Sequence, residues 1–156
     1  MSLQIRHAVV EDLVATVSLL RGQNLPIDGF ADLLRASPHH VLVAELNGAI
    51  VGSAALDVHG DAALLRSVAV ARDLVTLGVG SRLVTDAIDL ARREGVSDVY
   101  LLTTTAAQWF PRFGFVVTDR ESVPAPLAAT VEFTKACPAS ATTMRCALNT
   151  FSESVR

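Results

Sequence analysis

The most regular hydrophobic pattern in the chain follows the glycine at position 80. Apolar residues recur there with the 3.6-residue period of an amphipathic helix, at Leu83, Val84, Ala87, Ile88 and Ala91. Arg92 and Arg93, followed by Gly95, are typical of a helix C-terminus. The pattern therefore predicts a helix from Gly80 to about Arg93.

The first part of the chain predicts a strand and then two helices. Residues 3–8 favour a short strand, and residues 9–24 a helix whose apolar face holds Val10, Leu13, Val14, Val17 and Leu20. The segment "NLPIDGF", residues 24–30, reads as a loop because it carries a proline and a glycine. Residues 30–37 predict a second, short helix.

Two apolar runs in residues 40–58 flank Asn47-Gly48, which predicts an antiparallel hairpin because both residues tolerate a positive φ. After Gly60-Asp61 the chain returns as a third strand that ends at Val70. The sequence therefore predicts a meander of three strands before the amphipathic helix.

The remaining elements are shorter. Strands are predicted at residues 97–105, 114–119 and 141–148, a short helix at 106–113, and a helical face within 124–137. Hairpins combined with a crossover helix indicate an α+β architecture. At 156 residues, the chain is expected to form a single domain over residues 1–156.

Composition and charge exclude several classes of function. The formal net charge of −3 and the pI of about 5.7 disfavour nucleic acid as a partner. Cys137 and Cys146 lack the spacing of a disulfide framework or a zinc site. His39 and His40 are expected on the surface, and no metal is expected. No stretch reaches the ~20 apolar residues of a membrane span, so we expect a cytoplasmic protein without a membrane partner.

Gly78 and Gly80 lie between the third strand and the amphipathic helix. The first N–H groups of a helix have no intrahelical acceptor, so they can bind an anion such as a pyrophosphate. Glycine would let the backbone approach the phosphates closely. Two nearby glycines are also common in simple turns, and the spacing alone leaves both interpretations open.

The segments "SVAV", "VTLGVG" and "SRLVTDAI", and downstream "YLLTTTAAQWFPRFGF", resemble the GNAT superfamily of N-acetyltransferases. The resemblance implies a mixed, mostly antiparallel central sheet flanked by helices, with acetyl-CoA between the strands near 68–70 and 100–104. By this resemblance, the residues expected to bind acetyl-CoA are Val68, Ala69, Val70, Val75, Thr76, Leu77, Gly78, Val79, Gly80, Ser81, Phe110 and Arg112.

Three positions depart from the family pattern. Val75 stands where the motif has Arg or Gln, Thr76 where it has its first Gly, and Phe110 where many members have a tyrosine as general acid. Thr104, Thr105 or a water is then expected to protonate the leaving thiolate. The alternative is a non-catalytic GNAT-like module that binds a small ligand or a protein.

Glu45 and Glu132 are the candidate general bases. Arg66, two positions before Val68, is predicted by strand alternation to share the face of Val68 and Val70. Its guanidinium suits a carboxylate on the acceptor, and the alternative is a pair with an internal glutamate such as Glu45 or Glu132. The predicted acceptor side comprises Arg66, Asn24, Thr103 and Cys137.

A narrower resemblance comes from "NLPIDGF", "ALLRSVAV", "LLTTTAAQWFPRFGF" and "TVEFTKACPASATTM". These stretches are similar to arsenic-resistance N-acetyltransferases and to the acetyltransferase domain of N-acetylglutamate synthases. The resemblance implies acetyl transfer to the amine of a small anionic, amino-acid-like acceptor, arsenical amino acids included. It also implies direct transfer without an acetyl-enzyme and a homodimer through the C-terminal strand.

Overall fold

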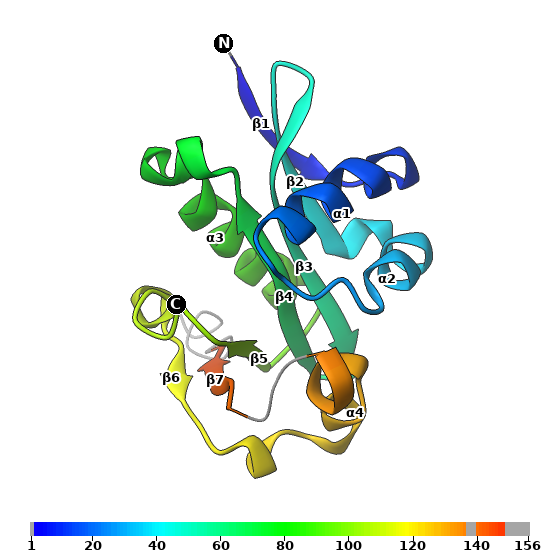
Figure 1. The fold of residues 1–156 in the computed structure, drawn as a ribbon. Helices are drawn as coiled ribbons and strands as arrows, with labels where there is room; N and C mark the ends of the chain where they lie inside the picture. The colour runs from blue at the N-terminus through cyan, green and yellow to red at the C-terminus, as the bar shows by residue number, and fades with distance from the viewer. Residues whose placement is uncertain (1, 137–139, 149–156) are drawn as a thin grey trace.

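A seven-stranded sheet forms the centre of the protein (Figure 1). The computed structural model describes residues 2–136 and 140–148. The strand order is β1-β2-β3-β4-β5-β7-β6. The strands are β1 (Leu3–His7), β2 (Val41–Leu46), β3 (Ala49–His59), β4 (Ala62–Val70), β5 (Asp98–Thr103), β6 (Val116–Val117) and β7 (Thr142–Ala147).

In the described ranges, four α-helices accompany the sheet: α1 (Leu13–Gly22), α2 (Phe30–Ala36), α3 (Val79–Arg93) and α4 (Ala125–Ala128). Short 3-10 helices cover Val10–Asp12, Pro38–His40, Arg72–Leu77, Phe110–Phe113 and Arg120–Ser122, and a π-helical turn covers Glu132–Ala136. The β4–β5 pair is parallel and the other strand pairs are antiparallel. The predicted α+β class with a mixed, mostly antiparallel sheet is confirmed.

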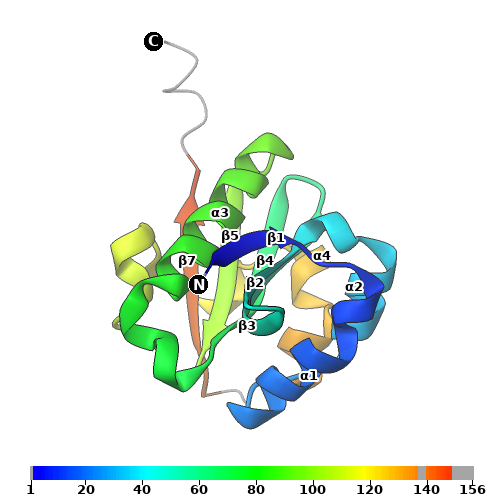
Figure 2. The same cartoon turned by 90° about the horizontal axis from the view of Figure 1, so that it is seen from above.

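The helices divide between the two faces of the sheet, with α3 on one face and α1, α2 and α4 on the other (Figure 2). The buried face of α3 packs on alternate residues of β2, β3 and β4. α1 and α2 cover residues of opposite parity, such as Val41 and Val43. The sheet is thus buried on both sides by segments that are distant in sequence.

The hairpin and the amphipathic helix form as predicted. Asn47 and Gly48 have φ values of 53° and 84°, the left-handed pair that a tight hairpin turn requires. The five apolar positions predicted for the inner face of α3 are all buried. Period and turn chemistry are local signals, which explains their success.

The first helix differs from its prediction. A 3-10 turn, Val10–Asp12, precedes α1, and the Asp12 carboxylate accepts a hydrogen bond from the Val9 N–H at 2.8 Å. A 3-10 helix has 3.0 residues per turn, whereas an α-helix has 3.6, so the initial 3-10 turn changes which side chains of the following helix face the sheet. Val14, predicted on the apolar face, is therefore 81% exposed, whereas Thr16 is buried.

Two other segments are less regular than predicted. The predicted strand 114–119 contains only the two-residue β6. The helical face within 124–137 is divided between α4 and the π-helical turn. This turn brings Glu132 against the sheet, where its side chain lies beside β4.

Candidate functional site

The main cavity lies where β4 and β5 separate. Their parallel pairing runs only from Ala62↔Asp98 to Leu64↔Tyr100, although β4 continues to Val70 and β5 to Thr103. A cavity of about 780 Å³ opens beside these two strands. It is lined by residues 23–26 after α1, 65–70 of β4, 101–106 at the end of β5, Val75, Gly78, Gly80, Ser81, Trp109, Phe110, Arg112 and Glu132.

One end of the cavity is formed by the start of α3. The predicted loop before it is a 3-10 helix, Arg72–Leu77, closed by Gly78 with φ of 77°. The Arg82 N–H donates to the Gly78 carbonyl at 3.1 Å, so the N–H groups of residues 79–81 precede the helical acceptors. Among the described side chains, none caps this end of the helix, so these N–H groups can bind an anion.

The two glycines have different roles. A Cβ on Gly78 would meet no atom within 4 Å, so the positive φ is the reason for glycine there. A Cβ on Gly80 would lie 3.3 Å from Val70 Cγ2 and 3.4 Å from the Trp109 ring. Gly80 therefore lets α3 pack closely against β4 and Trp109.

A β-bulge in β4 changes the direction of Arg66. The register with β3 shifts between Ser53 and Ala55, and Ser67 has a φ of 59°. The Ser53 hydroxyl, which is completely buried, donates to the Ser67 carbonyl at 2.7 Å. Because a bulge inserts one extra residue, it breaks the alternation of side chains along the strand.

The predicted face of Arg66 is therefore wrong. Val68 and Val70 pack on the α3 side of the sheet, but Arg66 lies on the opposite side, where its Nη1 is 3.5 Å from the position of a Cβ on Gly29. In a regular strand, Arg66 and Val68 would point to the same face, but the bulge at Ser67 lies between them and reverses this relation.

Arg66 and Glu132 form a buried ion pair that lines the cavity. The distance from Arg66 Nη2 to Glu132 Oε2 is 3.2 Å, and the two side chains are 3% and 7% exposed. Arg66 Nε donates to the Ser67 hydroxyl at 3.2 Å. Within the described part of the chain, Nη2 makes no contact with hydrogen-bond geometry. Of the two interpretations of Arg66, a pair with Glu132 is confirmed, and the same guanidinium still faces a cavity.

The end of β5 supplies hydroxyl groups to the opposite wall. Thr103 Oγ1 accepts a hydrogen bond from the Ala106 N–H at 2.9 Å, which fixes the turn after the strand. Thr104 and Thr105 follow on this wall and are exposed. Phe110, one of the three positions that depart from the family pattern, is buried against Trp109 and Phe115 at ring distances of 4.9 and 5.7 Å.

Several predicted site residues do not line this cavity. Glu45 of β2 is paired with Arg6 of the neighbouring strand β1, with 2.8 Å between Glu45 Oε1 and Arg6 Nε. Its predicted role as general base is therefore not supported. Leu77 is exposed, and Val79, the first residue of α3, is buried in the core. The side chain of Thr76 and the whole of Cys137 lie outside the described part of the structure.

Other lining residues were not predicted to be functional. Ser67 and Trp109 belong to this group, as does Gln23, whose amide donates to the Val70 carbonyl at the end of β4. Only the aromatic Trp109, beside the predicted Phe110, gave a signal in the sequence.

In the described segments, no helix is both long enough and apolar enough to cross a bilayer.

Comparisons with known proteins agree with this geometry. Residues 37–117 match the family model of the acetyltransferase (GNAT) domain. The amino-acid acetyltransferases of Ectopseudomonas mendocina and Pseudomonas putida are 29% and 31% identical over 130 residues, which cover 80% of this chain. The chain spans about 30% of the length of these curated relatives.

Solved structures share the fold. N-acetylglutamate synthase from Neisseria gonorrhoeae, complexed with coenzyme A and N-acetyl-glutamate, superposes with a TM-score of 0.80 at 23% identity, covering 96% of this chain and 36% of that one. A Mycobacterium tuberculosis protein in complex with CoA has a TM-score of 0.78 at 24% identity, covering 93% of this chain and 99% of that one.

The matched range covers more than half of the chain and includes the whole of β4, α3 and β5, the elements that form the cavity walls and its α3 end. The chain therefore belongs to the GNAT acetyltransferase domain family.

Proposed function

We propose that the protein is an acetyl-CoA-dependent N-acetyltransferase that acetylates the amine of a small, amino-acid-like acceptor by direct transfer. The observation that carries this proposal is one cavity with two chemically different parts. Uncapped N–H groups at the start of α3 form one part, and the buried Arg66–Glu132 pair lines the other. The N–H groups suit a diphosphate, and the ion pair suits a zwitterion.

The chain's own groups fit acetyl-CoA. Backbone N–H groups of residues 79–81 would hold the pyrophosphate, and Gly78 leaves space for it. The edges of β4 and β5 beyond Leu64 and Tyr100 are not paired with each other, so the β4 backbone at Val68–Val70 would bind the pantetheine arm. When bound, acetyl-CoA supplies an activated acetyl group as a thioester.

The Arg66–Glu132 pair is complementary to an amino acid. The guanidinium would bind the acceptor carboxylate, and Glu132 would lie near its ammonium group. Arg66 retains donor capacity for this because its Nη2 has no well-oriented acceptor in the described structure. A buried pair of opposite charges favours a ligand whose negative group lies against the guanidinium and whose positive group lies against the carboxylate.

Catalysis by these residues requires deprotonation and orientation of the acceptor. We propose that Glu132 accepts the ammonium proton, so that the amine nitrogen attacks the thioester carbonyl. The C–N bond forms as the C–S bond breaks, and the nitrogen passes its second proton to Thr104, Thr105 or a water. CoA leaves as a thiolate. Thr104, Thr105 or a water they bind would return a proton to it, a modest demand for a thiol of pKa about 8.5. Phe110 cannot donate this proton.

The experiment is an acceptor screen with thiol release as its readout. Amino acids, their decarboxylated amines and arsenical amino acids are compared at fixed acetyl-CoA, and calorimetry measures acetyl-CoA binding separately. We expect micromolar acetyl-CoA affinity and turnover only of acceptors that retain the acidic group. Acetyl-CoA binding without turnover leaves the acceptor proposal unsupported, and no binding at millimolar acetyl-CoA favours a non-catalytic module.

We also propose a homodimer. The resemblance implies pairing through the C-terminal strand, which is β7, but β7 lies between β5 and β6 in the sheet, so β6 is the edge strand on this side. The edge strand β6 beside β7 exposes Val116 and Val117 to 61% and 68%, and unpaired apolar edges favour strand pairing with another chain. Light scattering after size exclusion tests this proposal. A monomer at micromolar concentration contradicts it.

A further inference from the structure

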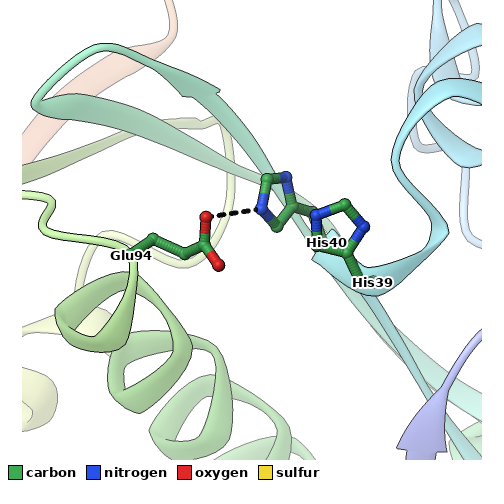
Figure 3. Close-up of side chains that lie close together, drawn as sticks. All are labelled: His39, His40 and Glu94. Carbon is green, nitrogen blue, oxygen red and sulfur yellow. Dashed lines mark hydrogen bonds and ion pairs between the residues drawn. The ribbon is translucent and has the colours of Figure 1, made fainter.

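Three side chains with metal-binding atoms come together away from the cavity. His39 and His40 end the 3-10 helix Pro38–His40 before β2, and Glu94 directly follows α3 (Figure 3). Their possible ligand atoms all lie within 4.8 Å of one another. None of the three lines the cavity between β4 and β5, so this cluster is independent of the proposed function.

Part of the cluster is already arranged as a ligand set. The distance from His40 Nε2 to Glu94 Oε1 is 3.1 Å, and the His40 side chain is only 11% exposed. The two histidine rings lie 4.1 Å apart between centroids and are tilted by 49°. Two ligands are therefore held by the fold, and the third, His39, is an exposed side chain that can rotate.

These distances can be compared with a tetrahedral zinc site. Zn–N and Zn–O bonds of about 2.0–2.2 Å place neighbouring ligand atoms about 3.3 Å apart. The His40–Glu94 distance of 3.1 Å meets this requirement. With all atoms within 4.8 Å, closure requires a movement of about 1.5 Å or less, which rotation of an exposed histidine can provide.

The donor types select the ion. Two imidazole nitrogens and one carboxylate suit Zn²⁺ and its transition-metal neighbours, whereas Mg²⁺ and Ca²⁺ prefer oxygen ligands only. Neutral imidazole is the ligating form, and a water would complete four-coordination.

We propose that His39, His40 and Glu94 form a Zn²⁺ site with three protein ligands. The ion joins the chain before β2 to the end of α3, which packs on the sheet through residues of β2, β3 and β4. It replaces the direct His40–Glu94 contact and stabilises the folded state, because the ligands are assembled only there.

The test is a calorimetric titration of tag-free, chelator-stripped protein with ZnCl₂, paired with thermal melts. We expect one Zn²⁺ per chain with micromolar affinity. At a Zn²⁺ concentration of about 100 times Kd, the melting temperature should rise by about 5–10 °C. His39→Ala and Glu94→Gln should each weaken binding at least tenfold, and because both positions are exposed, both variants should fold normally.

Two controls separate this site from other metal binding. His59→Gln removes a histidine that has a carboxylate partner, Asp57 at 2.9 Å, but belongs to no three-residue cluster among the described residues. Cys137→Ser removes a thiol that could bind Zn²⁺. Both should bind like the wild type. Binding that survives His39→Ala and Glu94→Gln, or that disappears with Cys137→Ser, would overturn the proposal, as would no binding at millimolar ZnCl₂.

Discussion

Replacing Arg66 by lysine tests whether its guanidinium binds the acceptor. Alanine is the poorer choice, because it would remove the whole guanidinium from beside Glu132, whose side chain is 7% exposed, and removing one partner of a buried ion pair costs about 3–5 kcal/mol. Lysine keeps the positive charge beside Glu132. It loses the planar fork and also the Nε donor that contacts the Ser67 hydroxyl at 3.2 Å.

The expected loss follows from the lost contact. A hydrogen bond to a charged group contributes about 1.5–3 kcal/mol. At 1.36 kcal/mol for each factor of ten, kcat/KM for the acceptor should fall about 10- to 150-fold. The KM for acetyl-CoA should stay within about twofold, since losing an acceptor contact does not affect cofactor binding. The effects on acceptor and cofactor should differ because the bulge directs Arg66 away from the sheet face that α3 covers.

The assay is steady-state thiol release with each substrate varied in turn, after a thermal melt has verified folding. Arg145→Lys is the matched control, because Arg145 also pairs with a carboxylate, Asp98 at 2.7 Å, but does not line the cavity. Equal losses for acceptor and acetyl-CoA would refute the assignment. An unchanged kcat/KM for the acceptor would do so as well.

Three further predictions concern the cofactor end, the bulge and acid stability. Gly78→Val places a β-branched residue at a φ of 77° and should raise the KM for acetyl-CoA at least tenfold, with a smaller effect for Gly78→Asn; equal KM values in all three proteins would contradict the phosphate site. Ser53→Ala removes the 2.7 Å bond to the Ser67 carbonyl, costing about 1–3 kcal/mol; calorimetry should show a lower melting temperature, and kinetics a higher acceptor KM. The Arg6 guanidinium lowers the pKa of Asp12 in the folded protein. The Asp12 carboxylate therefore stabilises the fold fully above the ordinary carboxyl pKa, and this stabilisation is lost as the pH falls through the lowered pKa. In melts from pH 6 to pH 3, the difference in melting temperature between the wild type and Asp12→Asn should shrink.

The sequence by itself determined the elements whose signals are local. The period of α3 and the Asn47-Gly48 turn identify a helix and a hairpin from a few neighbouring residues, and both occur as predicted. The spacing of Gly78 and Gly80 likewise identified the start of α3 as a candidate anion site. Dihedral preferences and side-chain periodicity act within a few residues, so no tertiary contact is needed to read them.

The tertiary structure alone decided which distant residues meet. The bulge at Ser67 depends on a hydroxyl from β3, so strand alternation gave the wrong face for Arg66. Glu132, rather than Glu45, reaches Arg66 because a π-helical turn lies against β4, and Glu94 meets His40 because α3 ends beside the start of β2. Such encounters are set by strand register and by how helices pack, and these depend on the whole chain at once.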